Sequence, residues 1–194
     1  MNGASDPTGG HPAKPGSTPP PAGVVAFWRD AGPGKWFARD EDFDARFRAR
    51  FIDAHWAASR RELEHWMDDA DGALALLLLL DQFPRNCFRG SGHAYATDPL
   101  ARHYAACAIE AGLDARVEPA LRVFVYLPFE HSEDVADQAR SMELMRTLDA
   151  DYMKYAVAHR DVIARFGRFP HRNRELGRTS TPGEQAWLDA GGGF

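Results

Sequence analysis

The sequence lacks most of the features that define a familiar class of site. Its 194 residues include only two cysteines, Cys87 and Cys107, and their spacing suits neither a zinc site nor a disulfide framework. The longest apolar run, residues 73–80, is far shorter than the ~20 residues that a membrane-spanning helix needs. The basic start and apolar run of a signal peptide are also missing. We therefore expect free thiols and a soluble, cytoplasmic protein with no membrane partner.

Phosphate-binding and hydrolase motifs are absent as well. No glycine-rich phosphate loop precedes an expected helix, no Gly-x-Ser-x-Gly sequence occurs, and no two histidines stand four residues apart as in zinc helices. A formal net charge of −5 argues against a nucleic-acid partner, which normally meets a basic face. The sequence thus predicts no metal site and leaves the cofactor unknown.

The N-terminal segment differs in composition from the rest of the chain. Residues 1–22 hold six of the 13 prolines and almost no large apolar side chain, so they cannot offset the entropy lost on ordering. We expect a flexible tail there and a single all-helical domain over residues 23–190.

Apolar residues recur with a helical period almost everywhere in that domain. Acidic residues 40–42 precede one helix, Asp71, Asp98 and Ser132 are predicted N-caps, and Gly167 is predicted to end the last long helix. We expect an all-α fold of about eight or nine helices in antiparallel pairs. The period alone does not separate a tetratricopeptide-repeat-like superhelix from an irregular bundle.

A short phrase occurs twice, as Phe-Pro-Arg-Asn at residues 83–86 and Phe-Pro-His-Arg-Asn at residues 169–173. Arg89 follows the first copy, and residues 165–178 around the second contain five arginines and one acid. A local excess of positive charge in an acidic chain calls for an anionic partner, either inside or outside the protein. Guanidinium groups beside amides suit carboxylate or phosphate recognition.

Two polar residues fall at positions that should be buried. Asp81 directly follows the apolar run, at what looks like the carboxyl end of a helix, where the dipole disfavours negative charge. His159 lies on the apolar stripe of its helix and should point inward. A buried Asp–Arg pair and a satisfied core histidine are the ordinary explanations, and a ligand site is the alternative.

The block at residues 127–134 carries His131 and Glu133 and could supply metal ligands or a general base. Simple helix capping by Ser132, with Glu133 and Asp134 at the positive helix end, is the ordinary explanation of the same residues.

These motifs resemble a known family. Residues 79–86, 127–134 and 166–178, in this order, are similar to the bacterial domain-of-unknown-function family numbered 924, and the resemblance spans about residues 24–188. It implies an all-helical fold similar to tetratricopeptide repeats and no established reaction. The proline-rich tail and the glycine-rich end depart from the family and should not touch the motifs.

Three hypotheses remain open. In the first hypothesis, the three motifs converge on one cleft that binds a small anionic ligand. This hypothesis fails if the motifs lie more than about 15 Å apart, because two long side chains cannot span that distance. Alternatively, the protein is a hydrolase or lyase, with or without a metal ion, that uses His131 or His159 as general base and Glu133 as a further catalytic candidate. The third hypothesis is an internal salt-bridge network in a scaffold that binds a protein partner. The predicted ligand-binding residues are Asp81, Arg85, Asn86, Arg89, His131, Glu133, His159, Arg168, His171, Arg172, Asn173 and Arg178.

Overall fold

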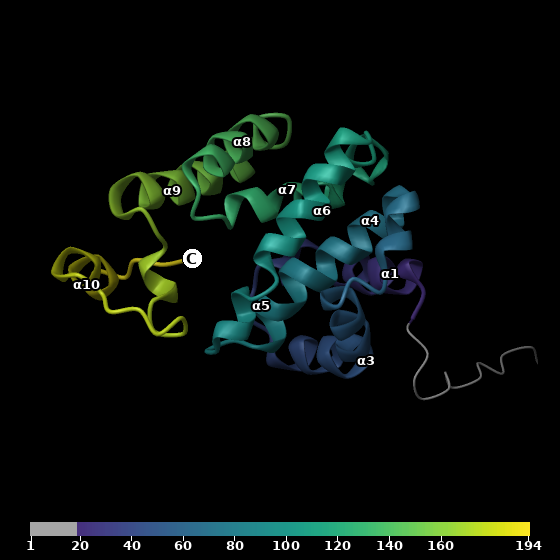
Figure 1. Ribbon diagram of the computed structural model, residues 1–194, viewed down its shortest axis with the longest axis horizontal. Coiled ribbons are helices and arrows are strands. Elements are labelled where there is room, and N and C mark those ends of the chain that lie inside the picture. The colour runs from purple at the N-terminus through teal and green to yellow at the C-terminus, as the bar shows by residue number, and fades with distance from the viewer. Residues whose placement is uncertain (1–18) are drawn as a thin grey trace, which may run out of the picture.

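Every regular element in residues 19–194, the part of the chain that the computed structural model describes, is helical (Figure 1). The all-α prediction is therefore confirmed. The predicted flexible tail lies mostly outside the described residues, and the first helix begins at Pro21, two residues before the expected domain start. No helix in the described range has the length and apolar character needed to cross a membrane. The α-helices are α1 (Pro21–Ala31), α2 (Pro33–Trp36), α3 (Glu41–Ser59), α4 (Ala70–Leu77), α5 (Phe83–Cys87), α6 (Asp98–Glu110), α7 (Val123–Glu130), α8 (Val135–Met145), α9 (Ala150–Phe166) and α10 (Pro182–Asp189).

Several helix ends follow the sequence signals. Asp40 accepts a hydrogen bond from the Phe43 N–H at the start of α3, and Gly167 ends α9 in the left-handed conformation at φ 70°.

Three predicted N-caps were wrong. Helix α4 is capped by Asp69 in place of Asp71, and α8 is capped by Asp134 in place of Ser132. At the start of α6 the N-cap position is Thr97, which makes no side-chain cap, and Asp98 is the first helical residue, with its carboxylate bound by arginines.

Helices α4 and α5 form one continuous helical stretch, joined by a π-helical turn at Leu78–Gln82. The sequence suggested that Asp81 lies at the carboxyl end of a helix. In the structure it lies inside a continuous helical stretch. Pro84 has no N–H to donate to the Leu80 carbonyl, so that oxygen accepts from the Thr97 hydroxyl instead, at 2.5 Å. The neighbouring Leu79 carbonyl is 2.8 Å from Nδ1 of His55. Side chains from outside the helix thus stabilise the π-turn, a feature often found at functional sites.

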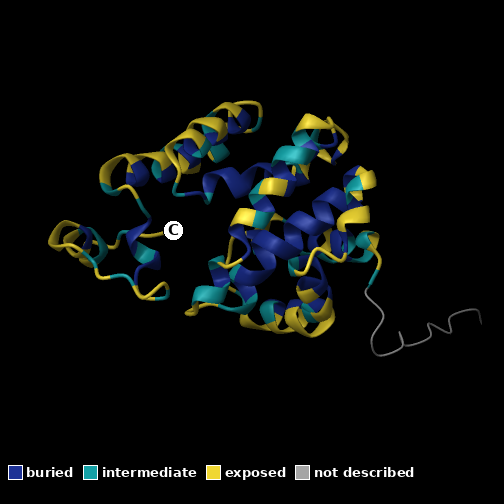
Figure 2. Cartoon of the chain, in the orientation of Figure 1, coloured by how far each residue is buried: buried dark blue, intermediate teal, exposed yellow. Residues whose placement is uncertain are grey.

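This central stretch is the core of the molecule. Residues 73–81 are all buried, and Figure 2 shows the buried ribbon running through α4, α5 and α7. A second, smaller apolar cluster joins Val162, Ile163 and Phe169 with Phe166 and Trp187 and holds α10 against α9. Figure 1 places the C-terminal end between this α9–α10 side and helices α5 and α6.

Candidate functional site

A cleft of about 900 Å³ opens where these two parts of the molecule meet. All three sequence motifs contribute to its wall, through Arg85, His131 and Arg172. The ring centres of His131 and His159 are 6.2 Å apart, and Arg172 donates to the His131 carbonyl at 3.0 Å. The predicted convergence of the motifs is therefore present, well inside the distance at which a single site would fail.

Asp81 is the buried anion beneath the cleft, with 1% of its surface exposed. One carboxylate oxygen lies 2.8 Å from Nδ1 of His131 and 3.1 Å from the Arg85 guanidinium, and the other accepts from the Gln82 amide at 2.7 Å. Burial alone would raise the pKa of Asp81, but Arg85 and His131 outweigh burial and hold it below its usual range. Asp81 is therefore an ionised carboxylate with every partner inside the protein.

Arg85 and Arg172 share a second carboxylate, Asp98. Arg85 donates to both oxygens, at 2.8 and 2.9 Å, and also to the Asp81 carbonyl at 2.9 Å. Arg172 makes a longer contact of 3.4 Å with Asp98. The half-buried Arg85 and the buried Arg172 thus neutralise two buried aspartates, as expected for charges in a low-dielectric interior.

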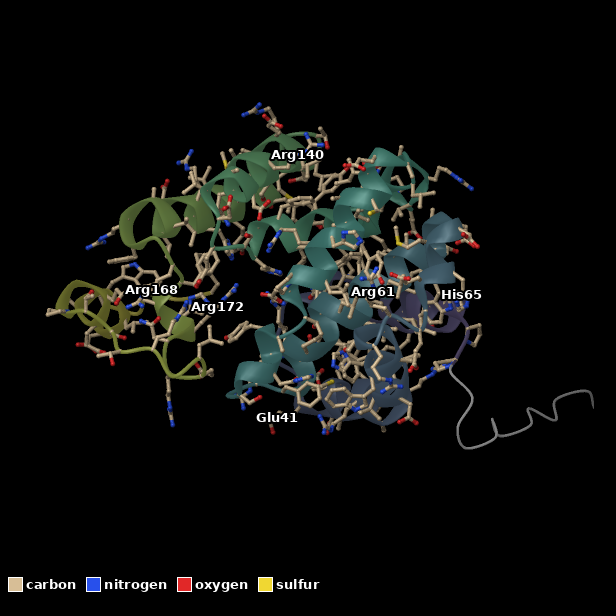
Figure 3. The ribbon with its side chains drawn as sticks, viewed as in Figure 1. Glu41, Arg61, His65, Arg140, Arg168 and Arg172 are labelled. Carbon is tan, nitrogen blue, oxygen red and sulfur yellow. The ribbon has the colours of Figure 1, made fainter. Side chains whose placement is uncertain are left out.

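Arg172 is held less completely than Arg85. It is 5% exposed, its Nε has no hydrogen-bond partner, and its guanidinium lies over the rings of Tyr95 and Phe169 at 4.7 and 4.4 Å. Burial and the nearby Arg85 lower its pKa to about 10, so it still carries a positive charge at pH 7. Figure 3 shows Arg172 and Arg168 on the segment that follows α9.

His131 has one nitrogen committed and one free. Because the ionised Asp81 only accepts, Nδ1 of His131 carries the ring proton, and Nε2 keeps a lone pair. No described side chain or backbone group bonds Nε2, and the residue lines the cleft. Burial and the charge of Arg85 lower the pKa of His131, although Asp81 acts in the opposite direction. Because the pKa is lowered, the ring is neutral at pH 7.

Glu130, directly before His131, presents the opposite chemistry. Its Oε2 is buried without a partner, and its Oε1 lies 3.2 Å from Nδ1 of His159. Burial, and then the charge of Asp81, raise the pKa of Glu130 to about 8. The carboxyl group is therefore mainly protonated at pH 7 and can donate.

His159 points inward, as its place on the apolar stripe predicted. Its Nδ1 lies 2.9 Å from the Tyr155 carbonyl, which can only accept, so Nδ1 carries the proton. Burial, and secondarily His131, lower its pKa to about 3. The ring is neutral and lines the cleft with one face against Phe194.

The glycine-rich end does touch the motifs, contrary to the sequence expectation. The Phe194 ring stacks on His159 with centres 3.7 Å apart and an angle of 11° between the planes. It also lies 5.6 Å from the ring of His171, whose buried Nδ1 has no partner. Burial, with the charge of Arg172, lowers the pKa of His171 to about 4.

Several predicted ligand-binding residues are instead tied to internal acids or hydroxyls. Asn86 and Arg89 line the cleft but bind the Asp44 carboxylate, at 2.6 Å and 3.1 Å. Asn173 donates to the Ser180 hydroxyl at 3.1 Å.

The remaining arginines of the second motif stabilise the chain that surrounds it. Arg178 binds both oxygens of Glu133, at 2.7 and 2.9 Å, and the same carboxylate accepts the Phe169 N–H at 2.8 Å. Arg168 binds both oxygens of Glu184, at 2.6 and 2.8 Å. Together with Arg172, which contacts Asp98, three of the five arginines in residues 165–178 therefore have an anionic partner inside the protein. Glu133, a catalytic candidate from the sequence, fixes the turn after α9 and is absent from the cleft wall.

Four residues that were not among the predicted site residues also shape the site: Glu130, Asp98, Tyr95 and Phe194. A signal existed for Glu130, because it ends the apolar run of α7 as Asp81 ends that of α4. Asp98 looked like an ordinary helix cap, and its pairing with Arg172, 74 residues away, depends on the tertiary fold.

The cleft combines a proton acceptor, a proton donor and a partly satisfied cation within one buried wall. In residues 19–194, no three His, Cys, Asp or Glu side chains are grouped so that they could hold a metal ion.

The fold and this cleft define an all-helical protein that buries a network of charged and neutral polar groups between its helices. The chain belongs to the family of bacterial proteins of unknown function DUF924, whose model matches residues 24–192. It is similar to the solved structure of the protein of unknown function ATU0120 from Agrobacterium tumefaciens, with 55% sequence identity and a TM-score of 0.86. That similarity covers 88% of this chain and 97% of the other. No curated protein matches the sequence.

Proposed function

We propose that the cleft binds a small molecule with an anionic group and that His131 acts on it as a general base, in a hydrolase or lyase reaction. The contact between His131 and Asp81 carries this proposal. A neutral imidazole, oriented by a buried carboxylate on one nitrogen and open to a cleft on the other, is the usual arrangement of a general base.

Glu130 supports the proposal as the matching general acid. Two adjacent residues of one helix end face the same cleft, one with a free lone pair and one with a proton to give. Pairs of groups whose surroundings push their pKa values apart are typical of acid–base sites. Glu130 would protonate a leaving group while His131 takes a proton from water or from the substrate.

Arg172 is the proposed contact for the anionic group. Arg85 already has both of its terminal nitrogens on Asp98, whereas Arg172 makes its hydrogen bonds through one terminal nitrogen, including the long contact to the same carboxylate. Phosphate and carboxylate groups are the anions that a guanidinium group binds most readily.

For the outer pairs, Arg168 with Glu184 and Arg178 with Glu133, we propose a structural role. Both arginines bind both oxygens of their partner, and neither lines the cleft. The internal-network hypothesis thus applies to this part of the motif, and the ligand hypothesis to the inner wall.

Acylation by diethyl pyrocarbonate, which attacks neutral imidazole nitrogens, tests the proposal. At pH 7 we expect His131 to be modified, with the exposed His103 as internal reference, and we expect inorganic phosphate to protect His131 alone. Arg172→Ala should abolish this protection, while Arg178→Ala should keep it. The proposal fails if His131 reacts as slowly as the fully buried His55, or if phosphate leaves its rate unchanged.

A further inference from the structure

Aromatic side chains line the cleft as well as polar ones. Besides Phe194 they are five: Trp36, Phe37, Tyr95, Tyr152 and Tyr155. Phe37 is 59% exposed and Tyr155 is 62% exposed, although large apolar groups usually avoid water when a partner is available. A ligand that is only an anion would leave this surface unused.

The position of Phe194 shows that an aromatic ring fits against His159 in the cleft. Its ring lies parallel to the His159 ring, at a centre-to-centre distance of 3.7 Å, and edge-on to Phe169 at 6.1 Å. Phe194 remains 56% exposed, so the contact with His159 is formed at an open position. The face of His159 therefore accepts a flat six-membered ring.

The segment that brings Phe194 to the cleft is built of glycines. Gly191 and Gly193 have φ of 86° and 150°, which side-chain-bearing residues rarely adopt, and a Cβ at Gly192 would lie 2.3 Å from the Trp187 ring. Within the described residues, the last backbone hydrogen bond of this segment is donated by the Gly192 N–H to the Trp187 carbonyl. The family match ends at residue 192 and does not include Phe194. Within the described residues, Phe194 is thus held by its ring contacts with His159, Phe169 and His171 and not by a backbone hydrogen bond.

We propose that the ligand of this cleft is an aromatic anion, whose ring stacks on His159 in the place of Phe194 and whose charged group reaches Arg172. This inference rests on the proposed function, because it assigns a chemical class to the same ligand. Phe194 and the ligand compete for one face of one imidazole. His159 is then a positioning group for the ring, since its Nδ1 is already engaged with Tyr155 and Glu130.

Binding of four small anions to the full chain tests this inference. Benzoate and phenyl phosphate carry a flat ring, cyclohexanecarboxylate has a ring of similar size that is not flat, and inorganic phosphate has none. We expect the first two to bind the unchanged protein more tightly than the other two, as measured by calorimetry. Phe194→Ala should strengthen the binding of benzoate and phenyl phosphate roughly two- to tenfold, the equivalent of one aromatic stacking contact.

Two variants serve as controls. Phe194→Leu keeps an apolar side chain without a flat face and should give a smaller gain than Phe194→Ala. Leu176→Ala, at another exposed apolar position that does not line the cleft, should change nothing.

The possible failures are distinct from one another. If cyclohexanecarboxylate binds as well as benzoate, or if Phe194→Ala weakens or does not alter benzoate binding, the aromatic class is wrong while the anion site stands. If none of the four anions binds, the proposed function itself is wrong and the inference falls with it.

Discussion

Nδ1 of His131 lies 2.8 Å from a carboxylate oxygen of Asp81, and this contact joins the residue that follows the central apolar run to the middle motif of the chain. The same oxygen is 3.1 Å from the guanidinium of Arg85. Asp81 thus fixes the tautomer of His131 and keeps Arg85 in the core at the same time. Stability and the proposed chemistry depend on one carboxylate.

Asp81→Asn should therefore destabilise the fold. The substitution removes the charge from the contacts with Arg85 and His131, while Arg85 stays paired with Asp98, so the expected cost is about 1–3 kcal/mol. Urea denaturation should show a correspondingly lower free energy of unfolding. Asp161→Asn, at an exposed carboxylate paired with Arg160, should stay within about 0.5 kcal/mol of the unchanged protein. Equal unfolding midpoints for the two variants would contradict the central place given to Asp81.

Glu130 should make stability fall as the pH rises. Its pKa is about 8 in the folded protein and about 4.5 in the unfolded chain, so between these values only the folded state holds the proton. A rise from pH 6.5 to 8 should then cost up to about 2 kcal/mol, and the loss should level off above pH 8. Glu130→Gln removes this titration and should give a flatter profile in this window.

Measuring the free energy of unfolding of both proteins at several pH values in the same buffer isolates this effect. The histidine contributions cancel in the difference, since both proteins contain the same histidines. Parallel profiles between pH 6.5 and 8 would show that Glu130 is not held protonated.

Asp98 should matter more for stability than Arg172. Asp98→Ala removes the anion that both arginines share, for an expected cost of about 3–5 kcal/mol. Arg172→Ala leaves Asp98 paired with Arg85, so the loss is limited to the hydrogen bonds to Asp98 and the His131 carbonyl and to the ring contacts, about 1–3 kcal/mol. Denaturant titration of the single and double variants yields the coupling energy. A larger loss for Arg172→Ala than for Asp98→Ala would reverse the assignment of the shared partner.

Arg178→Ala should lower the stability of the fold without changing the affinity for a ligand in the cleft. Arg178 makes two hydrogen bonds to Glu133 and one to the Phe169 carbonyl, so its loss should cost about 1–3 kcal/mol. The affinity for inorganic phosphate should stay unchanged, because Arg178 does not line the cleft. Thermal denaturation and calorimetry on the same sample measure both quantities, and a loss of phosphate affinity without a loss of stability would move Arg178 into the site.

The local signals in the sequence predicted much of the fold. The periodic apolar residues of α3 and the glycine after α9 depend on neighbours within a few residues, and both predictions were confirmed. The π-turn was not predictable in this way, because side chains from residues 55 and 97 satisfy its carbonyl groups. The residues around the π-turn do not indicate which distant side chains will contact its carbonyl groups.

The sequence predicted which polar residues form much of the candidate site, but it did not predict which of them contact one another. Asp81, His131, His159 and Arg172 were identified as misplaced or clustered polar groups, and the structure brings them together. Arg178 meets Glu133 across 45 residues and Arg172 meets Asp98 across 74, so the sequence could not separate Arg178 from Arg172 at the cleft.

Nitrogen NMR of the His131 ring tests the central claim most directly. At pH 7 the account predicts a neutral ring with its proton on Nδ1, and an Nε2 signal that shifts when inorganic phosphate is added. A ring protonated on Nε2, or an Nε2 signal that phosphate does not move, would contradict the assignment of His131 as a base facing a ligand site.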